Sequence, residues 1–288
     1  MFISLNGKII PDTDGSISTG DRGFLYGDAI FETLRTYNGK PFKLAEHLER
    51  MCCSAERLKI IPAYTNAEIS ESITKLLEKN SVQDAYVRIT LSRGEGGSAL
   101  QIGDNLKSTM LIQAKSLTPY DEKLYNKGMS LIVSRHRRST TSPIYSHKTT
   151  NLLTSILLKE EAKGKSAHDS IVLNTDGYVA ECIVSNIFMV TDESIATPSL
   201  DTNILPGITR STVLDICQNS GIPATEECFN IETLIKAEEV FITNSLMEIM
   251  PVSKIEDNKI GTEVPGEITR QLMSAYKNLI KESGNGRI

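Results

Sequence analysis

The sequence predicts a mixed α/β protein of the α+β class with two domains, and three observations support this prediction. The chain has 288 residues, which exceeds the length of one average domain. Three dipeptides typical of tight turns, Asn6-Gly7, Asn38-Gly39 and Asp176-Gly177, each separate two short strand-like segments and indicate antiparallel hairpins. Segments of helical period occur among the strands without a regular βαβ alternation, so a single parallel sheet is not expected.

The smaller N-terminal α/β domain is predicted to cover residues 1–116. Its strands flank a turn dipeptide or are rich in β-branched residues, and we expect them at 2–5, 8–10, 33–37, 41–43, 85–92 and 109–114. Its helices show apolar residues at helical spacing, and we expect them over 44–60 and over 67–79, the second opened by Asn66. Residues 117–128 contain Pro119 and lack a clear period, so we expect them to connect the domains.

The larger C-terminal domain is predicted to cover residues 129–288. Its strands are expected at 130–134, 170–174, 178–183, 187–190 and 239–243. Its helices are expected over 149–162, 208–220, 231–236 and 266–283. Gly207 precedes the second of these helices, so the first amide groups there would point at any anion that binds.

Composition and charge argue against several classes of function. The net charge is −5 and no basic stripe occurs, so nucleic acid is not expected as a partner. The one basic cluster, residues 135–138, is typical of a solvated strand end. The N-terminus lacks a signal-peptide pattern and no apolar run is long enough to cross a membrane, so we expect a cytoplasmic protein. The five cysteines and four histidines show no ligand spacing, which predicts buried, unpaired cysteines and no metal site.

Four separated segments carry side chains suited to chemistry. Lys148 lies in a loop that leads into a helix, and Glu181 ends a strand. Gly207-Ile208-Thr209-Arg210 opens a helix, and Thr243-Asn244-Ser245 ends a strand. Taken alone, each has a common structural explanation: a surface lysine, a solvent-facing glutamate, a helix cap and a turn. Spacing alone therefore does not identify a site.

Ordered motifs from residue 21 to residue 252 carry a resemblance that the single segments lack. They are Asp21-Arg22-Gly23-Phe24-Leu25-Tyr26-Gly27-Asp28, Phe31-Glu32-Thr33, His47-Leu48-Glu49-Arg50, Lys148-Thr149-Thr150-Asn151, Asp176-Gly177-Tyr178-Val179-Ala180-Glu181, Ser185-Asn186-Ile187-Phe188, Thr197-Pro198, Ile204-Leu205-Pro206-Gly207-Ile208-Thr209-Arg210, Ala237-Glu238-Glu239-Val240-Phe241 and Pro251-Val252. This set resembles the class IV (fold type IV) aminotransferases, which are pyridoxal-phosphate enzymes. The resemblance implies fold type IV with two α/β domains, and pyridoxal 5′-phosphate as the cofactor.

The resemblance assigns the cofactor chemistry to two residues. It implies that Lys148, in the C-terminal domain, holds the cofactor as a Schiff base and moves a proton once substrate has displaced it. It implies that Glu181 pairs with the pyridine nitrogen and keeps the ring protonated, so that the ring can accept electrons from the substrate.

The resemblance also assigns the cofactor phosphate to four residues. Arg50 is expected to bind it with a bidentate fork. The amides of Ile208 and Thr209 at the helix start and the Ser245 hydroxyl are expected to complete the phosphate site.

Two activities within this family remain open. Transamination between an amino acid, of the branched-chain or D-amino-acid type, and a 2-oxo acid comes first, because it is the commoner activity. The alternative is 4-amino-4-deoxychorismate lyase, which releases pyruvate and 4-aminobenzoate. The pattern Lys-x-x-Asn-Leu-Leu at 148–153 resembles D-amino-acid transaminases and lyases. Leu153 and Phe31 each replace a tyrosine of one transaminase branch, and Tyr26 is considered as a substitute contact to the cofactor's phenolic oxygen.

Five residues are expected to bind substrate: Phe31, Tyr86, Arg88, Arg93 and Asn244. The Tyr86-Val87-Arg88 segment resembles a branched-chain transaminase strand whose arginine meets a substrate carboxylate, although a solvent-facing structural role is the alternative for Arg88. The loops that contain Arg93 and Asn244 resemble lyase loops, and Arg93 is the second candidate for the carboxylate.

A non-catalytic cofactor-binding or scaffold protein is a third possibility. The joint presence of Lys148, Glu181 and Arg50 argues against it, because without catalysis nothing requires an amine, a ring-facing carboxylate and an anion site in one chain. The resemblance also implies a homodimer, small amino-acid and oxo-acid substrates, and an active site between the two domains.

Overall fold

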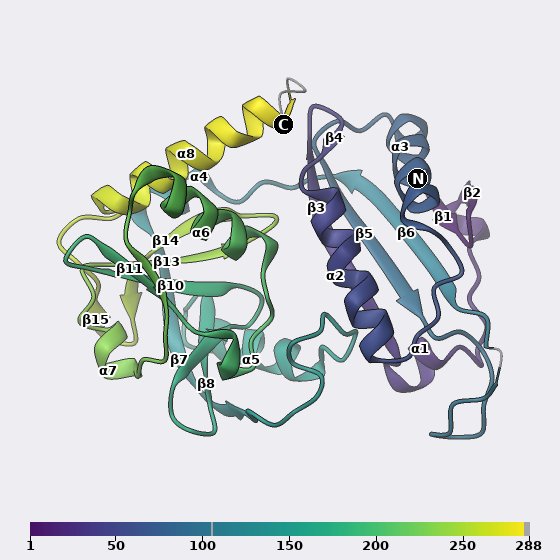
Figure 1. Cartoon of the computed structure of the whole chain (residues 1–288), viewed down its shortest axis with the longest axis horizontal. Coiled ribbons are helices and arrows are strands. Elements are labelled where there is room, and N and C mark those ends of the chain that lie inside the picture. The colour runs from purple at the N-terminus through teal and green to yellow at the C-terminus, as the bar shows by residue number, and fades with distance from the viewer. Residues whose placement is uncertain (105, 285–288) are drawn as a thin grey trace. The chain divides into compact units, whose positions relative to one another are not determined.

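The computed structural model describes residues 1–104 and 106–284, and Figure 1 shows its helices and strands. Contacts between Cα atoms divide the chain into two compact units. Unit 1 consists of Met1–Thr118, His147–Asn151 and residues 283–284, and unit 2 consists of Pro119–Ser146 and Leu152–Glu282. Each unit combines helices with a β-sheet, so the predicted mixed α/β class is confirmed. The bounds of independently folding domains stay a prediction.

Unit 1 contains an antiparallel sheet with the strand order β2-β1-β6-β5-β3-β4. Its strands are β1 (Phe2–Leu5), β2 (Lys8–Pro11), β3 (Ala29–Tyr37), β4 (Lys40–Pro41), β5 (Ala85–Ser92) and β6 (Thr109–Ser116). Its helices are η1 (Asp12–Asp14), α1 (Arg22–Tyr26), α2 (Leu44–Arg57) and α3 (Asn66–Asn80). The α2 helix packs on β3, and α3 packs on β1 and β6. Their apolar residues form one buried cluster with alternate residues of the strands.

The local sequence signals of unit 1 are realised closely. Asn6-Gly7 and Asn38-Gly39 have positive φ at both positions, as the tightest hairpin turns require. The N-cap of α3 is Thr65 rather than Asn66, because the Thr65 hydroxyl and the Glu68 carboxylate satisfy each other's backbone amides in a capping box.

Unit 2 contains a larger mixed sheet with the order β12-β11-β10-β13-β14-β7-β8-β9, and β15 pairs with β14. Its strands are β7 (Met129–Arg138), β8 (Asp169–Asn174), β9 (Val179–Cys182), β10 (Asn186–Thr191), β11 (Ser194–Thr197), β12 (Ala224–Glu226), β13 (Glu239–Asn244), β14 (Glu248–Ile255) and β15 (Asn258–Lys259). Its helices are α4 (Glu122–Lys127), α5 (Leu153–Gly164), η2 (Leu200–Thr202), α6 (Ile208–Ser220), α7 (Ile231–Leu234) and α8 (Glu267–Gly284).

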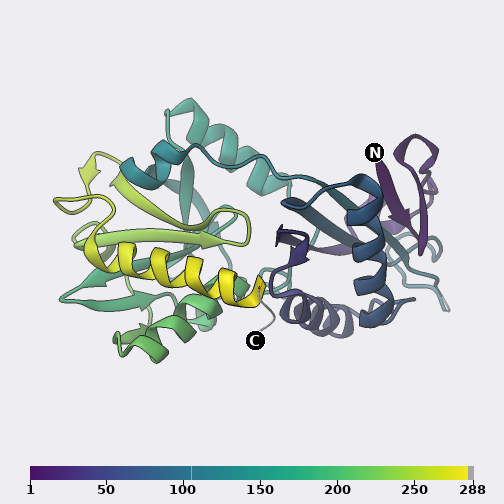
Figure 2. The same ribbon diagram turned by 90° about the horizontal axis from the view of Figure 1, so that it is seen from above.

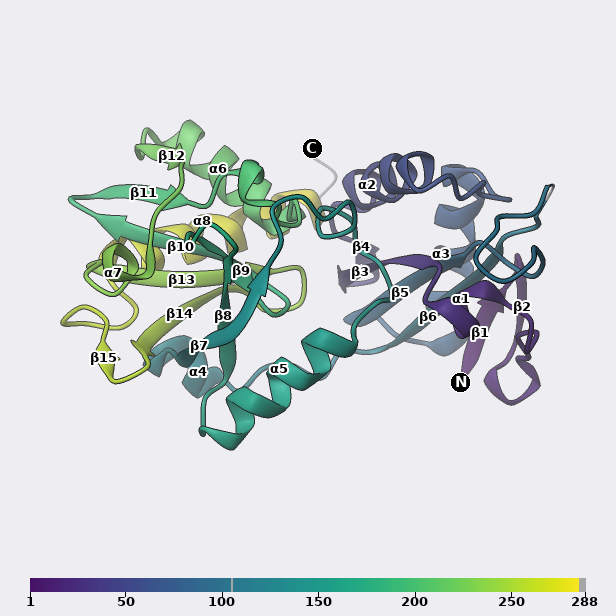
Figure 3. The ribbon, with the colours of Figure 1, turned by 90° about the horizontal axis from the view of Figure 1, so that it is seen from below.

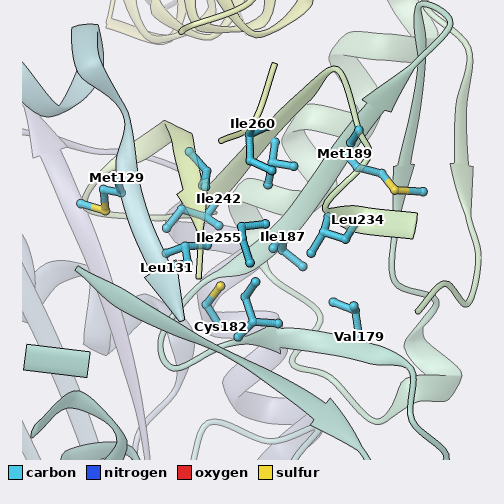
Figure 4. Packing of buried hydrophobic residues seen from close by; sticks show 14 of the residues in the cluster. Met129, Leu131, Val179, Cys182, Ile187, Met189, Leu234, Ile242, Ile255 and Ile260 are labelled. Carbon is cyan, nitrogen blue, oxygen red and sulfur yellow. The ribbon is translucent and has the colours of Figure 1, made fainter. Parts of the chain in front are cut away.

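The core of unit 2 is an apolar cluster, seen at close range in Figure 4. It includes Leu131 of β7, Cys182 of β9, Ile187 of β10 and Ile255 of β14. Helix α5 packs against β8 and β7, as Figure 3 shows. Helix α8, yellow in Figure 2, begins against β13, because Glu239 accepts hydrogen bonds from the Ile268 and Thr269 amides. The core therefore holds the strands from which the candidate site side chains of this unit extend.

Several segments differ from the sequence prediction. Helix α5 begins at Leu153 rather than at residue 149, because residues 147–151 are held against β3 of unit 1. Helix α4 lies inside the predicted connection 117–128, where the Asp121 side chain caps it. Strand β14 was not predicted, because Pro251 interrupts its pattern. The expectation of buried cysteines is correct for Cys182 and Cys217 and wrong for the three others, which are exposed.

Two searches of the described residues gave negative results. Within residues 1–104 and 106–284, no helix combines the length and the apolar character needed to cross a bilayer. In the same residues, no group of three or more His, Cys, Asp or Glu side chains is arranged to hold a metal ion.

Candidate active site

Lys148 lies on a short extended segment that belongs to unit 1. The Phe31 amide donates to the Lys148 carbonyl at 2.8 Å, and the Thr150 amide donates to the Ala29 carbonyl at 3.0 Å. These bonds add residues 147–151 to one edge of β3, so the position of the lysine is fixed by backbone pairing. The Lys148 Nζ atom lies 4.7 Å from the centroid of the Phe31 ring. Contacts thus group the lysine with unit 1, although its sequence position suggested the C-terminal domain.

Glu32, the next residue of β3, anchors a buried charge network. Its side chain is 1% exposed and faces α2, where His47 and Arg50 lie one turn apart. Arg50 donates through Nε to Oε1 at 2.8 Å and through Nη2 to Oε2 at 2.6 Å, and His47 Nδ1 lies 2.7 Å from Oε2. The predicted phosphate ligand Arg50 is therefore held by a bidentate carboxylate fork.

The protonation of this network follows from burial and charge. Burial raises the pKa of Glu32, but the Arg50 charge and the bonds from His47 and Arg50 outweigh it and lower the pKa to about 2. Burial lowers the pKa of His47, Glu32 raises it, and the charges of Arg50 and Lys148 lower it again, with a net decrease. Glu32 is therefore ionised at neutral pH and His47 is neutral, donating its Nδ1 proton to the carboxylate.

Phe31, Tyr86 and Arg88 share the face of the sheet opposite the helices. Strand β3 alternates, so Phe31 points away from the side that Glu32 occupies. The Arg88 guanidinium carbon lies 3.7 Å from the Phe31 ring centroid, and its Nε donates to Thr90 at 3.3 Å. The Phe31 ring thus has the Arg88 and Lys148 cations near it. Three of the five predicted substrate residues are together on the face where Lys148 lies.

Arg93 is placed differently from the other predicted substrate residues. It is buried and forms a bidentate pair with Asp28, with Nε–Oδ2 2.7 Å and Nη2–Oδ1 2.9 Å, and it also donates to the carbonyls of Leu58 and Lys59. Burial raises the pKa of Asp28, but Arg93 and Arg22 lower it with a net decrease. A substrate carboxylate would have to displace Asp28 to reach this guanidinium.

Tyr26, considered for the cofactor's phenolic oxygen, ends α1. Its ring stacks against the Arg22 guanidinium, with 5.0 Å between the guanidinium carbon and the ring centroid, and the residue is exposed.

In unit 2, Glu181 extends from β9 and accepts three hydrogen bonds. Arg138 of β7 donates through Nη1 to Oε1. Asn186 Nδ2 and the Leu205 amide donate to Oε2 at 3.1 and 3.2 Å. The side chains of Glu181 and Arg138 are only 9% and 12% exposed, and the Arg138 guanidinium carbon lies 4.7 Å from the Tyr145 ring centroid. The predicted ring-facing carboxylate is thus a buried and strongly oriented group.

The start of α6 lies against the same network. Its N-cap is Gly207, and no side chain of the described residues caps its first amides, those of Ile208 and Thr209. A Cβ atom at Gly207 would lie 1.9 Å from Asn186 Oδ1, so only glycine allows Asn186 to approach the helix start. Arg210 is occupied by Glu226 and the Pro198 carbonyl. The helix start is therefore available to an anion, and Asn186 couples it to Glu181.

Asn244 and Ser245 lie at the turn that follows β13. Asn244 Oδ1 accepts from the amides of Leu246 and Met247, both at 2.9 Å, and its Nδ2 donates to the Val184 carbonyl at 3.3 Å. Asn244 therefore shapes the turn that carries Ser245. The Thr243 hydroxyl is buried and has no hydrogen-bond partner among the described residues. A hydroxyl-rich turn with an unsatisfied donor suits an additional anionic ligand.

Four residues of these networks had no role in the sequence analysis: Glu32, His47, Arg138 and Asn186. The spacing of His47 and Arg50 on one helix face was a usable signal for the first two. Arg138 was interpreted as part of a solvated strand end; this is correct for Arg135 to Arg137, which are exposed, and wrong for Arg138. No sequence spacing relates Arg138 to Glu181, because their strands come together only in the folded sheet.

Comparison with known proteins agrees with this geometry. The chain is 36% identical over 291 residues to the aminodeoxychorismate lyase of Bacillus subtilis, covering 98% of this chain and 97% of that protein. It is 31% identical over 280 residues to the D-alanine aminotransferase of Bacillus licheniformis, covering 97% of each.

Solved structures give the same result. The branched-chain amino acid aminotransferase of Escherichia coli superposes with a TM-score of 0.93 at 26% identity, covering 97% of this chain and 94% of that chain. A thermophilic branched-chain amino acid aminotransferase (T.th.), complexed with N-(5′-phosphopyridoxyl)-L-glutamate, gives a TM-score of 0.89 at 28% identity, with coverage of 100% and 95%. The "Amino-transferase class IV" family matches residues 29–255, and the chain belongs to this family.

Proposed function

We propose that this protein is an aminotransferase that uses pyridoxal 5′-phosphate to transfer an amino group between an amino acid, of the branched-chain or D-amino-acid type, and a 2-oxo acid. The family uses this cofactor. The observation that carries the proposal is the placement of Lys148. Its amine is positioned by backbone pairing with β3, above a ring that also contacts Arg88.

The chemistry of the side chains fits the cofactor. An amine suits the aldehyde, and we assign this role to Lys148. A buried carboxylate suits a protonated ring nitrogen, and we assign it to Glu181. Arg50, the uncapped amides of Ile208 and Thr209, and Ser245 suit the phosphate. The unsatisfied Thr243 hydroxyl beside Ser245 supports this assignment.

The residues then divide the work of the reaction. When bound, the cofactor supplies an electron sink for the negative charge that develops at the substrate carbon. Lys148 holds the cofactor between turnovers and moves a proton as a free amine during them. Glu32 orients Arg50 and keeps it charged. Arg88, beside Phe31 and Tyr86, is placed to bind a substrate carboxylate, whereas Arg93 and Asn244 act by holding their loops.

The lyase that releases pyruvate and 4-aminobenzoate is the second candidate. It is favoured by the 36% identity to the Bacillus subtilis aminodeoxychorismate lyase, against 31% to the D-alanine aminotransferase. Lys148 moves a proton in either reaction, so the two functions share the residues assigned above. The homodimer and the cytoplasmic location are further predictions, and sedimentation of the purified protein tests the first.

The experiment separates cofactor binding from reaction type. Wild-type protein loaded with pyridoxal phosphate should be yellow, with an absorption band that Lys148→Ala removes and that the exposed control Lys163→Ala retains. Single-turnover mixing follows: loss of the band with D- or L-amino acids, with release of an oxo acid, supports transamination. Pyruvate release from 4-amino-4-deoxychorismate supports the lyase. A wild-type protein that binds no cofactor would show the proposal to be wrong.

A further inference from the structure

We propose that Arg138 is a positioning residue that biases the proton between Glu181 and the cofactor's ring nitrogen toward the nitrogen. The inference rests on the proposed function, because it presupposes that Glu181 faces the ring. It concerns only residues of unit 2, whose contacts are fixed within that unit.

Sheet geometry brings the two charges together. Strand β8 lies between β7 and β9, with Arg138 opposite Asn174 and Glu181 opposite Val172. Positions 172 and 174 of one strand share a face, so Arg138 and Glu181 extend on that face from the two neighbouring strands. The long arginine side chain crosses β8 to reach the carboxylate.

Arg138 is held on both ends of its side chain. Its carbonyl accepts from the Thr175 amide at 2.9 Å, and its guanidinium plane lies on the Tyr145 ring. The neighbouring Arg137 has another environment: it is exposed, and its Nη1 donates to the carbonyls of Ser134 and His136. Of these two arginines, Arg138 is the one that brings a cation to Glu181.

The hydrogen bonds to Glu181 leave a defined place for the ring. An ionised carboxylate offers about four acceptor positions. Among the described residues, Arg138 fills one on Oε1, and Asn186 and the Leu205 amide fill two on Oε2. The remaining position suits one N–H donor, which the protonated ring nitrogen supplies. All three protein donors stabilise the ionised form of the carboxylate.

The direction of the effect follows from distance. The guanidinium contacts the carboxylate directly, whereas a ring nitrogen bound to the remaining position lies farther from it. A positive charge opposes protonation of the nearer atom more strongly, because the Coulomb energy falls with separation. Arg138 therefore opposes transfer of the proton from the ring nitrogen to Glu181, and the N–H bond stays intact as the hydrogen bond forms.

The test reads the ring nitrogen itself. Wild-type protein and variants are loaded with pyridoxal phosphate labelled with ¹⁵N in the ring, and the ¹⁵N chemical shift is compared with protonated and unprotonated references. In Arg138→Met the equilibrium should shift about tenfold toward the unprotonated ring, equivalent to about 1.4 kcal/mol. Arg138→Lys, which keeps the charge, should remain close to wild type. Arg137→Met, the exposed neighbour, should not change the signal.

The outcomes are separable. An unchanged ¹⁵N signal in cofactor-loaded Arg138→Met overturns the inference and leaves the proposed function intact. A wild-type protein that fails to bind the labelled cofactor contradicts the proposed function instead. If Arg138→Met does not fold, as judged by circular dichroism, Arg138→Lys decides: a ring signal shifted toward the unprotonated reference in that folded variant overturns the role of the charge.

Discussion

Glu32→Gln tests the buried charge network that orients Arg50. The substitution keeps the shape of the side chain and removes the charge that Arg50 and His47 contact at 2.6–2.8 Å. Lowering the pKa of Glu32 from 4.5 to about 2 corresponds to about 3 kcal/mol of folding free energy at neutral pH. Removing one partner of a buried ion pair typically costs about 3–5 kcal/mol, so both routes agree. We expect the variant to lose about 3 kcal/mol.

Urea unfolding of the cofactor-free protein at pH 7, followed by far-UV circular dichroism, measures this loss without a contribution from cofactor binding. Glu49→Gln is the matched control, because Glu49 lies on the same helix and is exposed. Its effect should stay within about 0.5 kcal/mol.

The pH dependence sets a sharper condition. The pKa of Glu32 is lower in the folded protein, so its stabilisation is complete well above pH 4.5 and is lost as the pH falls toward 2. At pH 3 about 1.4 kcal/mol of the wild-type advantage should remain. His47, whose pKa is also lowered, adds a separate loss of stability as the pH falls below 6.5. A Glu32→Gln deficit below about 1 kcal/mol at pH 7, or one that is the same at pH 7 and pH 3, would refute the reasoning.

Two further substitutions test local geometry. Gly207→Ala places a Cβ atom 1.9 Å from Asn186 Oδ1, so we expect a loss of about 1–3 kcal/mol in urea unfolding and faster loss of cofactor on dialysis. Gly164→Ala, whose added carbon meets no described atom within 4 Å, should cost nothing, and equal losses in the two variants would contradict this account. Thr65→Ala removes the capping box with Glu68 and should cost about 1 kcal/mol, with faster amide exchange confined to the first turn of α3. Unaltered exchange there would argue against the cap.

Much of the local structure was readable from the sequence, because its causes are local. The Asn6-Gly7 and Asn38-Gly39 turns require positive φ, which glycine and asparagine tolerate. Helix α6 begins and ends as expected, over Ile208–Ser220, because Gly207 and Gly221 bound its periodic segment. Strand β14 escaped prediction because its central proline conflicts with the local pattern and only neighbouring strands stabilise it.

The candidate site shows the same division. Lys148, Glu181 and Arg50 were selected by an ordered set of motifs, which a sequence displays without knowledge of the fold. Their surroundings were not readable. That Arg93 is paired with Asp28 and that Asn244 shapes a turn depends on contacts between residues far apart in the chain or on side-chain direction.

The sequence by itself determined the family, the fold class and the residue types that match the cofactor, because these are recorded in composition, periodicity and motif order. Only the tertiary structure decided which charges meet. Strand pairing placed Lys148 on the edge of β3 and carried Arg138 across β8 to Glu181, and helix packing set Arg50 and His47 against Glu32. Electrostatic interactions depend on separation in space, and the distance between two residues along the chain does not determine that separation.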